Sequence, residues 1–162
     1  MKRYLSSLIL LIAFINLYAQ HIEFMGIKLG QPMGVINHSL QQKGFYKKNN
    51  YGSKSLFIYS GEFWKLKEAT LNVFTQNGLV TSIDVISTPK YYPVTTYNDL
   101  IKSLSNKYGK YDIRKGNYYI WIVEGGAIEV SYDKKEIHIF YMDTTSTNYI
   151  RKYQKRNVND DL

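Results

Sequence analysis

Tight turns between segments of alternating hydrophobicity constrain the fold of this chain more than any other feature. Asn77-Gly78 separates two apolar-rich segments, Gly125-Gly126 separates another two, and residues 133–135 connect the last pair. Asn-Gly is typical of a two-residue hairpin loop, because both residues tolerate the left-handed backbone that such loops need. Connections this short join antiparallel neighbours. The chain is therefore predicted to contain an antiparallel sheet.

Helical segments precede the strands in two places. Residues 32–43 and 96–107 carry apolar side chains at helical spacing, and a glycine follows each segment. The other apolar segments predict strands at 24–29, 55–64, 69–75, 79–87, 118–124, 127–132 and 136–142. Because the order of elements occurs twice, we predict an α+β fold of two helix-plus-three-strand units, about 24–88 and 94–143. The two units would form one antiparallel sheet with both helices on one face.

The first nineteen residues have the pattern of a secretory signal peptide. Lys2 and Arg3 precede the apolar run LILLIAFI, and Ala19 supplies a small residue for cleavage before Gln20. An apolar run this short cannot span a bilayer, which takes about 20 residues. We therefore expect a periplasmic or secreted protein, with a single domain over 20–145, a polar tail over 146–162 and no transmembrane segment after cleavage.

Composition limits the partners of such a protein. Cleavage after Ala19 would remove two of the 21 basic residues and none of the 13 acidic ones, leaving a net charge of +6. This charge is compatible with an acidic protein or an envelope glycan. Export, and the lack of a dense basic stripe with interleaved aromatic residues, argue against nucleic acid. Cysteine is absent, so disulfides, thiolate zinc sites and a lipid-modified cysteine are excluded.

Alternation sorts the strand residues onto two faces of the sheet. We predict that the aliphatic set packs under the helices: Leu56, Ile58, Leu71, Val73, Ile83, Val85, Ile120, Ile122, Ile128, Val130, Tyr132, Ile137 and Ile139. The opposite face then mixes aromatic and polar residues, as protein–protein contact surfaces do. Candidate partner-binding residues on that face are Phe57, Tyr59, Phe74, Tyr119, Trp121, His138 and Phe140. An alternative is that these aromatic side chains pair across strands beneath covering loops.

Catalytic motifs are not found in the sequence. His21, His38 and His138 lack the spacing of zinc ligands, and the chain has no Walker loop, GxSxG elbow or GxGxxG loop. We therefore predict no catalytic residue, metal site or cofactor. A hydrolase with a site near His138, Glu129 and Asp133 is the least favoured alternative.

The opening strand and helix carry a resemblance to known proteins. The segment FMGIKLG at 24–30, Gly44-Phe45 after the first helix and Lys107-Tyr108-Gly109 after the second resemble a group of small exported bacterial proteins. Their helix-then-strands units look like the two-repeat architecture of the beta-lactamase inhibitor protein and of the small lipoprotein of the outer-membrane assembly machinery. The resemblance implies a concave sheet that binds another protein. This chain lacks the acylated cysteine of the lipoprotein and the disulfide of the inhibitor, so no binding residue is carried over.

The sequence thus predicts a non-enzymatic exported binding module that contacts an unknown protein through the open face of its sheet. The alternative is a protein that binds cell-envelope glycan or peptidoglycan through stacked aromatic rings and positive charge.

Overall fold

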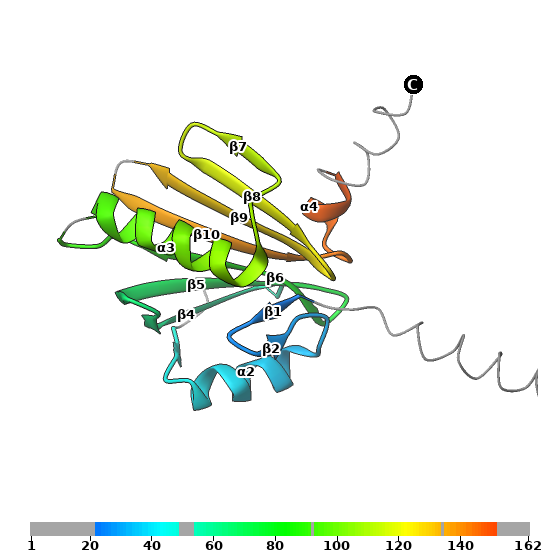
Figure 1. The fold of residues 1–162 in the computed structure, drawn as a ribbon. Coiled ribbons are helices and arrows are strands. Elements are labelled where there is room, and N and C mark those ends of the chain that lie inside the picture. The colour runs from blue at the N-terminus through cyan, green and yellow to red at the C-terminus, as the bar shows by residue number, and fades with distance from the viewer. Residues whose placement is uncertain (1–21, 49–53, 92, 134, 152–162) are drawn as a thin grey trace, which may run out of the picture.

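A computed structural model describes residues 22–48, 54–91, 93–133 and 135–151 (Figure 1). Eight antiparallel strands form one sheet in the order β3-β4-β5-β6-β10-β9-β8-β7, and β1 and β2 form a separate small hairpin. The strands are β1 (Glu23–Phe24), β2 (Ile27–Lys28), β3 (Tyr46–Lys47), β4 (Leu56–Phe63), β5 (Leu66–Gln76), β6 (Leu79–Ser87), β7 (Ile113–Lys115), β8 (Tyr118–Val123), β9 (Gly126–Asp133) and β10 (Glu136–Asp143). The helices are α2 (Met33–Gln42), α3 (Pro93–Tyr108) and α4 (Thr147–Tyr149). The predicted α+β class with an antiparallel sheet is confirmed.

The Asn77-Gly78 turn joins β5 to β6 as predicted. Asn77 and Gly78 both have left-handed backbones, with φ of 54° and 79°, and the flanking residues Gln76 and Leu79 are paired. The predicted single strand at 24–29 is wrong. Met25 and Gly26 also have positive φ, of 52° and 76°, and they fold this segment back on itself as the β1–β2 hairpin.

Both long helices pack against the same face of the sheet. Ile36 and Leu40 of α2 belong to one buried cluster with Leu100 and Leu104 of α3. Burial of these helix side chains removes apolar surface from water and is the main force that holds the two helices to the sheet. The predicted helix-facing set is confirmed for the strand residues that join this cluster: Leu71, Val73, Ile83, Val85, Ile128, Val130, Ile137 and Ile139, with Tyr132 packed against it.

Two short edge strands, β3 and β7, were not predicted from the sequence. They contain two and three residues, too few to show alternation. Each edge strand carries an exposed lysine, Lys47 or Lys115. A charged side chain on an edge strand disfavours pairing with another sheet.

Candidate binding face of the sheet

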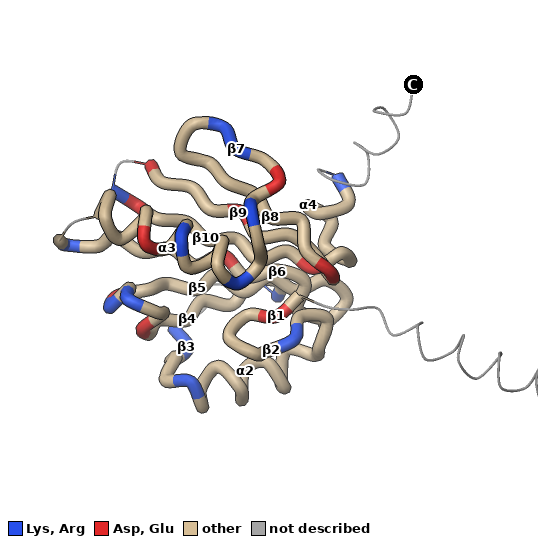
Figure 2. The backbone as a smooth tube through the Cα atoms, in the orientation of Figure 1, with Lys and Arg blue, Asp and Glu red and all other residues tan. Residues whose placement is uncertain are grey.

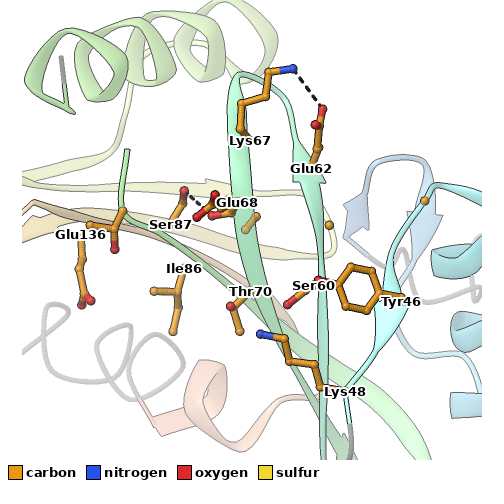
Figure 3. Close-up of a pocket in the computed structure, with 14 residues that line it drawn as sticks. Tyr46, Lys48, Ser60, Glu62, Lys67, Glu68, Thr70, Ile86, Ser87 and Glu136 are labelled. Carbon is orange, nitrogen blue, oxygen red and sulfur yellow. Dashed lines mark hydrogen bonds and ion pairs between the residues drawn. The ribbon is translucent and has the colours of Figure 1, made fainter. Parts of the chain in front are cut away.

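A hollow of about 630 Å³ lies on the sheet face opposite the helices, over β3 to β6 (Figure 3). Ser60, Thr70 and Ile86 are paired across β4, β5 and β6 and form one row of its floor. Side chains at paired positions of antiparallel strands share a face. The register of the sheet therefore builds the floor of this hollow.

Polar and charged side chains surround that floor. Tyr46 and Lys48 approach from the β3 side, and Glu68 and Glu136 lie at the other end of the hollow (Figure 3). Tyr46 is 61 % exposed. The hollow thus offers an aromatic ring, hydroxyl groups and both signs of charge.

Ion pairing within the hollow is weak. Lys67 Nζ lies 3.4 Å from Glu62 Oε2, and both side chains are mostly exposed. Exposed ion pairs contribute roughly 0–1 kcal/mol, because water screens the charges. Both charges can therefore reorient toward a ligand at little cost.

His138 extends the floor row onto β10, opposite Ile86. Its ring lies between two carboxylates, with Nδ1 3.7 Å from Asp84 Oδ1 and Nε2 3.5 Å from Glu136 Oε2. Burial raises the pKa of Asp84, and the neighbouring His138 opposes that rise. Asp84 Oδ1 is buried and accepts no hydrogen bond from the described part of the chain.

The C-terminal segment packs at the other end of this face. Ile120, Ala127 and Met142 form a small buried cluster, and Tyr149 of α4 packs against it. Nearby, Glu129 accepts a hydrogen bond from the Tyr118 hydroxyl. The face is therefore partly buried over β8–β10 and hollowed over β3–β6.

Three of the seven candidate residues lie on the open face as predicted: Phe74, His138 and Phe140. Phe74 pairs with Ser82, while Phe140 pairs with Asp84 and Glu129. The two phenyl rings meet edge to face, with centroids 6.2 Å apart. The alternative of cross-strand aromatic pairing therefore holds for part of this face.

The other four candidates, Phe57, Tyr59, Tyr119 and Trp121, were assigned to the wrong face. Tyr59 is fully buried and its hydroxyl donates to Asn37 Oδ1 of α2 at 2.6 Å. Trp121 is 1 % exposed and its indole N–H donates to the Gly109 carbonyl at 3.0 Å. Phe57 and Tyr119 pack against the main core. These side chains hold helices to the sheet and cannot present a binding surface there.

The reverse error affects four aliphatic residues. Leu56 pairs with Phe74, Ile58 with Asn72, Ile120 with Glu129 and Ile122 with Ala127. Their partners are open-face residues, so the predicted inward placement of these four is wrong.

A β-bulge explains the error in β4. The register shifts between Gly61 and Phe63, where a two-residue step in β4 lies opposite a three-residue step in β5 from Leu66 to Ala69, so the extra residue lies in β5. Without the shift, the pairing of Phe63 with Leu66 would place Ile58 opposite Leu71, on the helix face. With the shift, Tyr59 lies opposite Leu71. Alternation alone carries no sign of such a shift.

The error in β8 could have been avoided from the sequence. Val123 pairs with Gly126, and Trp121 pairs with Ile128. Any two-residue turn near Gly125 would pair Trp121 with an even-numbered residue of β9, and the central even-numbered residues, Ile128 and Val130, are aliphatic. Counting pairs outward from the turn therefore identifies Trp121 as a helix-face residue, whereas the apolar character of both faces of β8 conceals it.

Comparison with known protein families, curated proteins and solved structures finds no match to this chain. Among the described residues, no group of three or more histidine or acidic side chains is arranged to hold a metal ion. No helix in the same part of the chain is long and apolar enough to cross a membrane.

Proposed function

We propose that this is an exported, non-enzymatic binding protein that holds another protein against the open face of its sheet. The observation that carries the proposal is the hollow over β3–β6. Its floor combines Ile86 with hydroxyl side chains, and its margin carries Tyr46 and charged groups of both signs. The hollow is mixed in polarity, as non-obligate protein–protein interfaces are as a whole, and its exposed tyrosine is of the residue type that often anchors them.

The order of the strands supports a two-unit form of this fold. A helix precedes the antiparallel strands β3–β6, and a second helix precedes β7–β10. The two sets of strands meet at β6 and β10. We interpret them as two similar units in the manner of the beta-lactamase inhibitor protein, although each unit has four strands where three were expected.

Export rests on residues 1–19, which lie outside the described part of the chain. The charged start, short apolar run and Ala19 support cleavage before Gln20. N-terminal sequencing of the protein purified from its own host tests this step, and an intact Met1 would contradict it. The positions of lysine and arginine do not favour a nucleic-acid partner, because these residues are spread over many elements instead of forming one stripe (Figure 2).

Filling the hollow tests the binding proposal. Thr70 lies in the floor between Ser60 and Ile86, so Thr70→Arg would place a long cation where the partner is expected to contact the sheet. Gln41→Arg adds the same side chain on the exposed surface of α2 and serves as the matched control. The tagged full-length chain is crosslinked in its own host and the captured proteins are identified by mass spectrometry.

The proposal predicts one dominant, saturable protein partner that the wild type and Gln41→Arg capture and Thr70→Arg does not. Equal capture by Thr70→Arg, with its melting temperature unchanged, would show that the partner does not use this hollow.

An envelope glycan is the second candidate, favoured by one observation. The exposed Tyr46 ring lies at the hollow beside Ser60, whose hydroxyl group can donate to or accept from a sugar. Retention of the protein on purified cell-wall polymer would favour this function if Tyr46→Ala abolished the retention and the crosslinking experiment captured no protein partner. His138→Ala tests the remaining alternative, a hydrolase with its site near His138. That alternative predicts that the variant sharply loses hydrolytic activity.

A further inference from the structure

A second surface lies on the helix side of the sheet, between α3 and the tips of the β1–β2 and β4–β5 hairpins. It is a groove of about 290 Å³. Tyr141 closes its floor, Leu100 and Leu104 form the α3 wall, and Met25 and Trp64 come from the hairpin tips. The groove is separate from the hollow, because the sheet lies between them.

Met25 and Trp64 are unusual residues for their positions. Each occupies a hairpin tip with a φ of 52°, a left-handed backbone that disfavours side chains larger than glycine or asparagine. Each is also an exposed large hydrophobic side chain, at 37 % and 40 %. Folding stability alone would favour glycine or a polar residue at both tips. Strained positions that persist are a feature of binding and catalytic sites.

Lys107 is the charged residue of the groove lining, and none of the described lining residues is acidic. Lys107 Nζ lies 4.7 Å from the centre of the Tyr108 ring, and Lys65 Nζ lies 5.0 Å from the centre of the Trp64 ring. Lys65 also pairs with Asp99 at 2.9 Å, on the outer side of α3. The groove therefore presents the Lys107 ammonium group beside apolar surface, whereas Asp99 balances the charge of Lys65.

From this apolar floor and the Lys107 ammonium group beside it, we propose that the groove binds an acidic segment of a partner protein. The segment inserts one large apolar side chain between Trp64 and α3, and a neighbouring Asp or Glu meets Lys107. The concave shape favours a protein over a lipid bilayer, because a bilayer is entered by side chains that project outward. The site is independent of the open-face hollow, so one molecule can hold two partners.

Trp64 provides a direct readout of the groove. The chain has two tryptophans, and Trp121 is buried, so quenching of tryptophan fluorescence by acrylamide reports mainly on Trp64. A phage library of random twelve-residue peptides is selected on the folded full-length protein. Enriched peptides are then synthesised and titrated while quenching is followed.

The proposal predicts enriched peptides that carry a large apolar residue beside Asp or Glu and that reduce quenching of Trp64. Their affinity, measured by isothermal titration calorimetry because Trp64→Ala removes the fluorescent reporter, should fall at least tenfold in Trp64→Ala and in Lys107→Glu. The matched controls, Leu79→Ala at another exposed hydrophobic residue and Lys102→Glu elsewhere on α3, should leave affinity unchanged. Met25→Ala provides a second test if Trp64→Ala melts below the assay temperature.

Two results would overturn the proposal. One is enrichment of no peptide whose binding depends on Trp64 or Met25. The other is protection of Trp64 from acrylamide by vesicles containing phosphatidylglycerol while no peptide protects it, which would make this a membrane-contacting surface. Neither result depends on the hollow, so both leave the open-face proposal standing.

Discussion

Replacing Trp121 by alanine tests the most consequential feature of the fold, namely which face of β8 is buried. The indole is 1 % exposed, packs against the rings of Tyr111 and Tyr119, and donates a hydrogen bond to the Gly109 carbonyl. Truncation of a buried tryptophan to alanine lowers the free energy of unfolding by about 3–5 kcal/mol, because it leaves a cavity and loses apolar burial. Gly109 is exposed, so its carbonyl can accept from water and adds little to the loss.

We expect Trp121→Ala to lose about 4 kcal/mol. For a domain of this size, each kcal/mol lowers the melting temperature by about 3–4 °C, so the expected shift is roughly 14 °C. Thermal unfolding followed by far-UV circular dichroism measures the shift, and urea titration measures the free energy independently. Trp121→Phe, which keeps a ring and loses the indole N–H, should cost about 1–2 kcal/mol.

Ile122→Ala is the matched control in the same strand. Ile122 lies on the other face and is 46 % exposed, so its truncation should cost less than about 1 kcal/mol. If Trp121→Ala melted within about 3 °C of the wild type while Ile122→Ala unfolded, β8 would present the opposite face to the helices. The register argument would then be refuted, and Trp121 would return to the candidate binding surface.

Three further predictions concern the packing of the sheet. Gly126→Ala should prevent stable folding, measured by circular dichroism, because the added Cβ would lie 2.0 Å from a main-chain carbonyl oxygen of β10. Asn37→Ala removes the acceptor of the buried Tyr59 hydroxyl and should lower the free energy of unfolding by about 1–3 kcal/mol in urea titration; no loss would mean that water replaces it. Burial raises the folded-state pKa of Asp84, so the wild type loses stability as pH rises through that pKa. Asp84→Asn should melt higher at pH 7 and like the wild type below pH 3.8, and a lower melting temperature at pH 7 would show that attraction to His138 outweighs desolvation.

The positions of the elements could be read from the sequence because their signals are local. Asn77-Gly78 predicted a hairpin, and Gly44 and Gly109 predicted the ends of two helices; both glycines have a φ of 85°. Such turns and helix ends depend on backbone preferences of one or two residues, which neighbouring elements alter little.

The candidate site depended on information that is not local. Phe74, His138 and Phe140 were placed correctly because the strands around them alternate clearly. Tyr59 was misplaced because both faces of β4 carry apolar residues, and because a β-bulge with its extra residue in β5 shifts the β4–β5 pairing by one position. A Cβ at Gly61 would lie 2.5 Å from the Phe45 ring, so the two residues are matched across a distance of sixteen positions.

By itself, then, the sequence determined the class of fold, the two long helices and the order of strands β4–β6 and β8–β10, but not the β1–β2 hairpin or the edge strands β3 and β7. In β4, only the tertiary structure decided that Phe57 and Tyr59 lie on the helix face and not on the open face. A register that moves by one residue brings the other set of side chains to the core, and both the β4–β5 register and the packing of Phe45 against Gly61 exist only once separate segments have come together.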